Sequence, residues 1–395
     1  MKKNILLVLR GSALNRGMNT GLENLVWGLS RRGHNVIIIS GGKLPESFGS
    51  NYDIPYGVTY RFVGGDNRLY ERLKSEVERV IEERKVDCII SRLHSVVPLL
   101  GDKKNRIYLP PVLLNQGALY PSLFRRIVIG IIKNGPLRQI MSELSLYQSR
   151  KQVSHVIAVS EAVARSLISN GLLPETKMSV IYRGIEHKKY FAKRTNKDHQ
   201  HSKNHRILFV GNIIESKGVG DLIMSLEYLD TSNTSVQIVL CGAVEVNYQK
   251  KLTAIAERFG YAKNLVFRGC LAQHELIKEY QSADFFVFPS YSEGLAKALL
   301  EAMSCELPVI CGDIPSLREV VVDGYNGLIV PIKNPRAIAK AILRFAAEPE
   351  LARKCALNAR RTVVSKFSVD AELDQWEELI YRFTDAPEYR QTGGY

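Results

Sequence analysis

Glu293 and Glu301 are the residues whose type and spacing point most directly to chemistry. A carboxylate accepts two hydrogen bonds, and a ribose or hexose presents neighbouring hydroxyls as paired donors. At helical spacing, eight residues would separate the two carboxylates by roughly 12 Å along the axis and about 80° in azimuth, close to the length of a nucleotide sugar. The simpler alternative is that Glu293 caps a helix and Glu301 lies on a solvated face.

The segments around these glutamates give the pair a context. An apolar strand, 284–288, runs into a short loop that holds Glu293, and an Ala/Leu-rich helix that holds Glu301 follows. A Pro-Val-Ile strand at 308–310 and an Asp-Gly-x-x-Gly turn at 323–327 come next. This order resembles the donor-binding domain of retaining glycosyltransferases of the GT-B fold, family 4 (group 1). The resemblance implies that Glu293 contacts the transferred sugar and Glu301 the ribose diol.

A second motif, 207–221, reads as a strand, a glycine turn and a helix start. Such a turn presents backbone N–H groups, and Lys217 adds a cation, so a diphosphate fits there. The family usually has an Arg directly after the first glycine, where this chain has Asn212, which offers one neutral amide instead of a guanidinium fork. Arg183 is a candidate for the missing charge, or a solvated residue at the edge of a linker. The nucleotide-sugar-binding residues implied by the resemblance are Gly21, Gly211, Asn212, Lys217, Gly269, Glu293, Gly294, Leu295, Ala296 and Glu301.

The first half of the chain offers weaker candidates. Gly21 opens the first expected helix and would let a diphosphate or an acceptor approach the backbone. Many relatives have a histidine after the strand that corresponds to 112–114, and this chain has Gln116 there, which can position a substrate but cannot take a proton. His94 is either an alternative cleft residue or a surface histidine. The predicted catalytic set is therefore Glu293, Lys217, His94 and Gln116.

The domain organisation follows from length and pattern. A chain of 395 residues exceeds what one core usually supports, and two series of short apolar strands separated by helices indicate two doubly wound domains with parallel sheets. The strands predicted for the first domain are 5–9, 36–40, 86–90, 112–114 and 156–159, and those for the second are 207–210, 236–240, 265–267, 285–288 and 309–311. The resemblance implies an α/β GT-B architecture, with two Rossmann-like domains facing across a cleft. We predict an acceptor-binding domain over 1–185, a polar linker over 186–205, a nucleotide-sugar-binding domain over 206–368, a helix over 369–383 that crosses back to the first domain, and a frayed tail over 384–395.

The net charge of +14 lies in the first half, since residues 1–190 hold 29 Lys and Arg against 15 Asp and Glu, and residues 191–395 hold 25 of each. A field of one sign favours an anionic partner, such as a phospholipid surface, a lipid-linked diphosphate or nucleic acid. The alternative is a basic surface that only keeps the protein soluble. The segment 120–133 mixes apolar residues with Arg125, Arg126 and Lys133, and is either a core helix or a segment that enters a lipid interface.

The rest of the composition narrows the class of protein. The start of the chain reads as a strand and not as a signal peptide, and no stretch approaches the ~20 apolar residues of a membrane span. Six scattered cysteines without a Cys-x-x-Cys pair, and no Asp-x-Asp triplet, favour reduced thiols and a metal-independent reaction. We expect a cytoplasmic protein, either free or peripheral on the inner face of the cell membrane.

Together with these observations, the resemblance implies a retaining, metal-independent glycosyltransferase. It would move a sugar from a nucleotide-diphosphate sugar to a hydroxyl of a glycan or lipid-linked acceptor, in cell-surface polysaccharide or glycolipid assembly. No nucleic-acid-binding motif is evident, but a polyanion- or nucleic-acid-binding protein is the alternative that the basic first half leaves open. A GT-B-fold subunit with weak catalysis is a third reading, because of Asn212 and Gln116.

Overall fold

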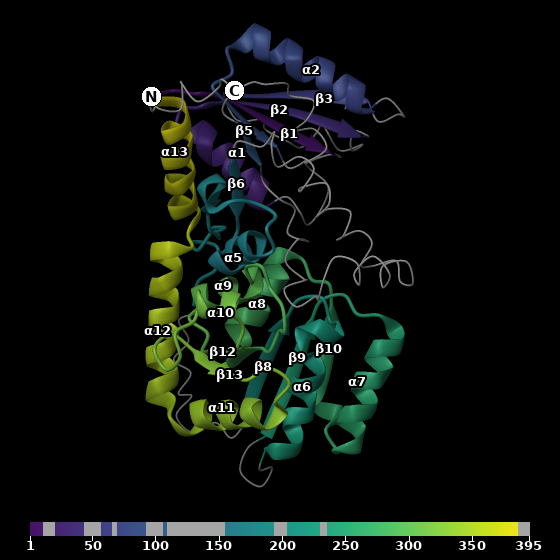
Figure 1. Ribbon diagram of the computed structural model, residues 1–395. Coiled ribbons are helices and arrows are strands. Elements are labelled where there is room, and N and C mark those ends of the chain that lie inside the picture. Colours follow the sequence, from purple (N-terminus) through teal and green to yellow (C-terminus); the bar gives the residue numbers. More distant parts are fainter. Residues whose placement is uncertain are drawn as a thin grey trace. The chain divides into compact units, whose positions relative to one another are not determined.

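The computed structural model describes residues 1–10, 20–42, 57–64, 69–91, 106–108, 155–192, 204–229 and 235–385. The chain forms two compact units, one of Met1–Gly184 with Val369–Tyr395 and one of Ile185–Ser368. Each unit is built on a parallel sheet with helices packed against it (Figure 1). The α/β class with two Rossmann-like domains is therefore confirmed.

The first unit contains a seven-stranded sheet of order β3-β2-β1-β4-β5-β6-β7. Its strands pair in parallel within the described residues, and β1 pairs with β2 on one side and with β4 on the other. Its strands are β1 Asn4–Arg10, β2 Asn35–Gly42, β3 Val58–Gly64, β4 Cys88–Ser91, β5 Arg106–Tyr108, β6 His155–Ala158 and β7 Met178–Val180. Its helices are α1 Thr20–Arg31, α2 Leu69–Arg84, α5 Glu161–Ser169, α13 Val369–Asp385 and the 3-10 turn Glu175–Lys177.

Strand β1 shows how the sequence covers both faces of this sheet. Leu6 and Val8 face a cluster that includes Leu73 and Val77 of α2, whereas Ile5 and Leu7 face a cluster formed with α1 and α13. Alternate residues of a strand point to opposite faces, so a continuous apolar run is buried on both sides. The run at the start of the chain is therefore the central strand of a fully covered sheet.

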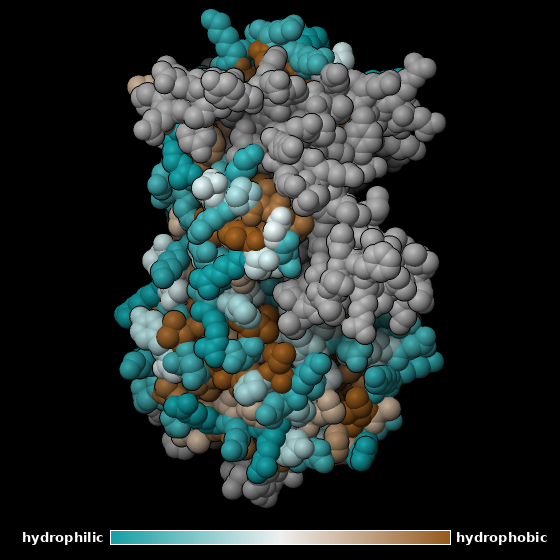
Figure 2. Space-filling view, in the orientation of Figure 1, coloured by the Kyte–Doolittle hydropathy of each residue, from teal (hydrophilic) through white to brown (hydrophobic). Residues whose placement is uncertain are grey.

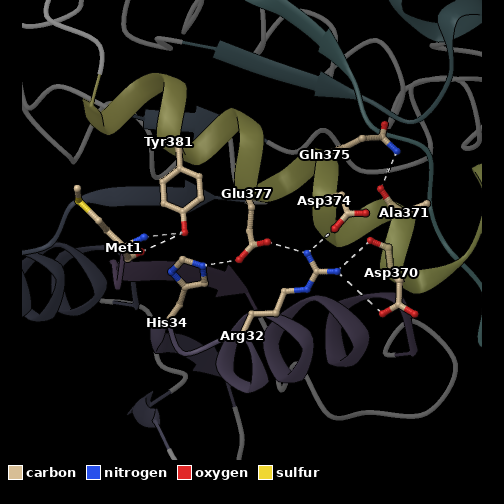
Figure 3. A network of polar contacts seen from close by, with 9 residues as sticks. All are labelled: Met1, Arg32, His34, Asp370, Ala371, Asp374, Gln375, Glu377 and Tyr381. Atoms are coloured by element: carbon tan, nitrogen blue, oxygen red, sulfur yellow. Dashed lines mark hydrogen bonds and ion pairs between the residues drawn. The ribbon is translucent and has the colours of Figure 1, made fainter.

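Helix α13 belongs to the first unit although it lies at the other end of the chain. Trp376, which is 2% exposed, packs in the same core cluster as residues of α1 and β1. A polar network joins the residues that follow α1 to α13 (Figure 3): the Arg32 guanidinium donates to Glu377 Oε2 at 2.6 Å, and His34 Nε2 lies 2.9 Å from Glu377 Oε1. The Lys3 N–H donates to His34 Nδ1 at 3.2 Å, so Nε2 carries the ring proton and donates to Glu377.

The second unit contains a six-stranded parallel sheet of order β10-β9-β8-β11-β12-β13. Its strands are β8 Asn204–Val210, β9 Ser235–Cys241, β10 Leu265–Gly269, β11 Phe285–Phe288, β12 Val309–Gly312 and β13 Leu328–Val330. Its helices are α6 Val219–Met224, α7 Val246–Arg258, α8 Gln273–Ser282, α9 Lys297–Ser304, α10 Pro315–Arg318, α11 Pro335–Ala347 and α12 Pro349–Lys366, with 3-10 turns at Glu215–Lys217, Ser225–Tyr228 and Ala262–Asn264.

The start of the predicted linker is part of the second unit. Tyr190 is 3% exposed, and its carbonyl oxygen accepts hydrogen bonds from Ser304 Oγ at 2.8 Å and Arg360 Nη1 at 2.9 Å. The expectation of a polar linker beginning at Glu186 is corrected here, because a buried aromatic ring and a satisfied backbone carbonyl hold this stretch to the unit. Residues 193–203 of the predicted linker, and the tail from residue 386, lie outside the described residues.

The strand predictions hold for the long apolar runs. Four strands were not predicted, namely β3, β5, β7 and β13, of which β5, β7 and β13 have three residues each. The predicted strand at 112–114 lies outside the described residues.

Within the described ranges, no helix combines the length and the apolar character needed to cross a bilayer. On the face drawn in Figure 2, hydrophilic side chains cover most of the described surface and apolar side chains form separate groups.

Candidate functional site

The sheet of the second unit has one topological switch point, between β8 and β11. From β8 the chain runs to β9 on one side, and β11 pairs with β8 on the other. Ligands of open α/β sheets bind at the carboxyl ends of the strands, at such a point. The segments that follow β8 and β11 carry Lys217 and Glu293, so the topology brings the two predicted motifs to one place although they are 76 residues apart.

Direct contacts hold these two segments together. The Tyr291 N–H donates to the Ser216 carbonyl oxygen at 2.9 Å. Gly218 adopts φ +68°, and a Cβ at that position would lie 2.1 Å from the Pro289 carbonyl oxygen. A glycine is needed there both for the left-handed backbone and for the close approach of the two chains.

Lys217 and Glu293 form an ion pair with a distance of 2.6 Å from Nζ to Oε1. The two side chains are 16% and 11% exposed, so they are shielded from water but still accessible. The ammonium can bind phosphate oxygens, and the carboxylate can accept hydroxyl hydrogen bonds. The structure thus brings together the predicted diphosphate contact and the predicted sugar contact.

Glu301 lies within α9 and is 4% exposed. Its Oε2 accepts a hydrogen bond from the Tyr280 hydroxyl at 3.0 Å, and its Oε1 lies 3.3 Å from Lys297 Nζ. Burial and the nearby carboxylate raise the pKa of Tyr280, which keeps the phenol protonated as a donor. The Tyr190 side chain also hydrogen-bonds to the Glu301 carboxylate, and the 54% exposed Lys297 side chain covers one of its oxygens.

The helical spacing expected between Glu293 and Glu301 is wrong. Helix α9 begins at Lys297 after an extended residue, Ala296, so Glu293 lies in the preceding loop. The estimate of roughly 12 Å and about 80° requires one continuous helix and does not describe this pair. The helix expected after Lys217 also differs, since α6 has only six residues and carries Asp221 in its first turn. Any anion bound there would depend on Lys217 more than on a helix dipole.

Tyr291 and Asp221 are part of this place and were not predicted. The Tyr291 hydroxyl donates to Asp221 Oδ2 at 2.6 Å, and Asp221 is 6% exposed. Burial, and then this hydrogen bond, raise the pKa of Tyr291. No local pattern links residues that are 70 apart; the one available signal is the position of Tyr291 two residues before Glu293.

The remaining predicted residues of the second unit line the same edge of the sheet. Gly211 follows β8, and Gly269, at φ +66°, ends β10 and accepts the Gly242 N–H at 2.8 Å. Asn212 is exposed, and its side chain is open to solvent. Three further residues, which are buried or half-buried, form the turn from Glu293 into α9: Gly294, Leu295 and Ala296.

In the first unit, Gly21 lies in the first turn of α1, beside Arg183. A Cβ on Gly21 would lie 3.9 Å from the Arg183 side chain. Burial lowers the pKa of Arg183, and the nearby Glu372 opposes that shift. The role of Arg183 as the missing phosphate-binding charge stays a prediction. His94 and Gln116 lie outside the described residues, as does the segment 120–133.

The described parts of the chain contain no group of three or more His, Cys, Asp or Glu side chains that could hold a metal ion. Lys217, paired with Glu293, is a cation that could bind a diphosphate. That the reaction needs no metal stays a prediction.

Comparisons with known proteins indicate the family of the chain. Residues 192–362 match the family model described as "Glycosyl transferases group 1", and residues 15–189 match the model described as "Glycosyltransferase Family 4". The chain is 24% identical over 349 residues to the capsular polysaccharide biosynthesis glycosyltransferase CapM of Staphylococcus aureus. The aligned region covers 80% of this chain and 87% of CapM. It is 30% identical over 242 residues to an uncharacterised glycosyltransferase of Methanocaldococcus jannaschii, and spans 59% of that relative's length.

Two solved structures share the fold. A glycosyltransferase from Rickettsia africae superposes with a TM-score of 0.74 at 18% identity, over 99% of both chains. Anabaena Alr3699/HepE in complex with UDP superposes with a TM-score of 0.73 at 18% identity, over 96% of this chain and 99% of the other. At these identities the likeness shows the fold.

Proposed function

We propose that this chain, which belongs to the group 1 glycosyltransferases and has the GT-B fold, transfers a sugar from a nucleotide-diphosphate donor to an acceptor hydroxyl with retention of configuration. The observation that carries the proposal is the ion pair of Lys217 and Glu293 at the switch point of the second unit. A cation for the diphosphate and a carboxylate for the sugar lie side by side where this fold class binds ligands.

In the proposed reaction Lys217 binds the donor diphosphate, Glu293 accepts hydrogen bonds from sugar hydroxyls, and Glu301 accepts them from the ribose. The bond between the anomeric carbon and the diphosphate oxygen breaks as positive charge develops on the sugar. The acceptor oxygen then bonds to the same face, and its proton passes to the departing diphosphate. The contribution of the protein is positioning and the stabilisation of charge, and Lys217 acts on the negative charge that the leaving group gains.

The relatives indicate which substrates to test first. UDP is the nucleotide in one neighbouring structure and UDP-glucose in another, which makes a UDP-sugar the first donor to test. CapM is named for capsular polysaccharide biosynthesis, and we extend that role to this chain as a glycan or lipid-linked acceptor. The expected location is the cytoplasm or the inner face of the cell membrane.

The test is a panel of nucleotide sugars scored for binding and for slow hydrolysis of the donor. Glu301→Ala should weaken the binding of the preferred nucleotide sugar about tenfold, because two hydrogen bonds from the ribose to a carboxylate are lost. Glu350→Ala is the matched control, since this carboxylate is 71% exposed and pairs with Arg353 on α12. Unchanged binding by Glu301→Ala would show that the site assignment is wrong. Binding without hydrolysis or transfer would favour the weakly catalytic subunit suggested by Asn212.

The basic first half of the chain supports a second candidate function, which is binding to polyanions or to an anionic membrane. Vesicle sedimentation tests it. Arg125 and Arg126 are the residues to replace by Glu. The double replacement should reduce sedimentation with vesicles that contain anionic lipid, because it changes the local charge by four. Equal sedimentation of both proteins would reject the membrane contact.

A further inference from the structure

Tyr291 contacts the segment after β8 at two points. Its N–H donates to the Ser216 carbonyl oxygen at 2.9 Å, and its hydroxyl donates to Asp221 Oδ2 at 2.6 Å. Ser216 and Asp221 lie on either side of Lys217 in the chain. Tyr291 therefore holds the Lys217 segment at both of its ends.

Tyr291 is also two residues from Glu293, in the loop that follows β11. A second side-chain contact also joins this loop to the Lys217 segment: Ser290 Oγ lies 3.4 Å from the Ser216 carbonyl oxygen, at the long limit for a hydrogen bond. The short bond from Tyr291 to the buried Asp221 carboxylate is a charge-assisted one, which is about twice as strong as a neutral bond. It is also shorter than the contact of Ser290 Oγ with the Ser216 carbonyl oxygen.

A third element meets the ring of Tyr291. Lys333, in the loop after β13, places its Nζ 5.5 Å from the ring centroid, within the range of a cation–π contact. The backbone of Lys333 is left-handed, with φ +57°, a conformation that disfavours residues other than glycine. The ring of Tyr291 thus contacts Lys333, while its hydroxyl bonds to Asp221 of α6.

We propose that Tyr291 is a positioning residue, whose hydroxyl bond to Asp221 fixes the Lys217 segment against the Glu293 segment so that both side chains are already in place for the diphosphate and the sugar. The inference rests on the proposed function, since it assumes that Lys217 binds the diphosphate. When a donor arrives, the ion pair of Lys217 and Glu293 must open or share its charges with the ligand. Because Tyr291 holds the two segments together, the ion pair can open while the segments stay ordered, so less conformational entropy is lost on binding.

The experiment measures the dissociation constant of UDP and the melting temperature of the full chain for a small set of variants. Tyr291→Phe removes the hydroxyl and keeps the ring, the backbone bond to Ser216 and the contact with Lys333. We expect about a tenfold weaker binding of UDP. Tyr325→Phe is the matched control, because Tyr325 is 50% exposed in the turn before β13 and undergoes the same chemical change. It should leave the dissociation constant unchanged.

Two replacements of Asp221 separate positioning from general stability. Asp221→Asn keeps an oxygen that accepts the hydroxyl hydrogen bond, so UDP binding should stay within about threefold of the natural chain. Asp221→Ala removes the acceptor and should weaken binding about as much as Tyr291→Phe. The double variant Tyr291→Phe with Asp221→Ala should bind UDP no more weakly than either single variant, since both changes break the same contact.

The outcomes distinguish the two proposals. If Lys217→Ala weakens UDP binding but Tyr291→Phe lowers only the melting temperature, the positioning role is overturned and the proposed function stands. If neither Lys217→Ala nor Tyr291→Phe changes UDP binding, and the donor panel finds no other nucleotide, the assignment of the site itself fails. If the losses of UDP affinity from Tyr291→Phe and Asp221→Ala add up in the double variant, the positioning role is also contradicted.

Discussion

The Nζ atom of Lys217 lies 2.6 Å from Oε1 of Glu293, so the two groups predicted to bind opposite parts of the donor bind each other in the free chain. Both are largely shielded from water, where a charge pair is stronger than at an open surface. The carboxylate therefore competes with a diphosphate for the same ammonium.

This competition gives opposite expectations for two substitutions. Glu293→Gln removes the competing charge, so UDP should bind several-fold more tightly, whereas sugar transfer should fall about a hundredfold because a charge-stabilising contact is lost. Lys217→Ala should weaken UDP binding and transfer together. Isothermal titration with UDP and a steady-state transfer assay measure the two effects. Weaker UDP binding by Glu293→Gln would contradict the competition.

How far the sequence predicts this site depends on how local each part is. The apolar runs, the Glu-Gly loop and the glycine turn before Lys217 are local patterns, and they led to the α/β fold and to the correct strands β1, β2, β8 and β11. The contact of Lys217 with Glu293 depends on which strands are neighbours, and the resemblance supplied that information. The helical spacing of Glu293 and Glu301 failed because propensity alone does not place a helix start, and α9 begins only at Lys297.

Tyr291, Asp221 and Tyr280 could not be predicted, for a physical reason. Each acts through a hydrogen bond to a residue that is distant in sequence, and such bonds leave no periodicity in the chain. The three-residue strands were missed in the same way, since Arg106–Tyr108 and Met178–Val180 are too short to show an alternating pattern. Their pairing partners in the sheet, not their own residues, make them strands.

Glu372 of α13 should destabilise the first unit at alkaline pH. Burial raises the pKa of this carboxyl to about 7, against which the Gly184 N–H and Arg183 act in part. The pKa of Glu372 in the folded chain lies above the unfolded value near 4.5. The stability that this carboxyl contributes is therefore fully present below pH 4.5 and is lost as the pH rises through 7. A shift of this size corresponds to about 3 kcal/mol. Glu372→Gln should thus raise the free energy of unfolding by about 2 kcal/mol at pH 8 and have little effect at pH 4.5.

Glu377 is the matched control on the same helix. Burial acts to raise its pKa, but hydrogen bonds from His34 and Arg32 outweigh burial and lower it. The same change, Glu377→Gln, should therefore destabilise the chain at pH 8. Urea unfolding at pH 4.5 and pH 8 compares the two variants, and effects of the same sign at pH 8 would contradict the argument.

His155 should make the chain less stable in mild acid. Burial, and then the charge of Arg382, lower its pKa to about 4, and its Nδ1 is buried without a hydrogen-bond partner among the described residues. The unfolded chain takes up the proton near pH 6.5, so stability is fully present above that value and falls as the pH drops to about 4. The expected loss is up to about 3 kcal/mol. His155→Asn, which does not titrate, should flatten this part of the curve, measured by urea unfolding at half-unit steps from pH 7.5 to pH 4. If the free energy of unfolding changes with pH equally in the natural chain and in His155→Asn, the pH dependence belongs to other groups.

Glu306, which follows the end of α9, stores backbone strain. Its φ of +55° is in the left-handed region, where a side chain costs about 1 kcal/mol and glycine costs little. The carboxylate partly offsets this cost through Arg360, whose Nε lies 3.5 Å from Glu306 Oε1, but the pair is half-exposed and contributes at most about 1 kcal/mol. Glu306→Gly and Glu306→Ala both remove the ion pair and differ in the strain. The glycine variant should therefore be the more stable of the two by about 1 kcal/mol in urea unfolding. Equal stabilities, or a more stable alanine variant, would show that the backbone at this position relaxes without cost.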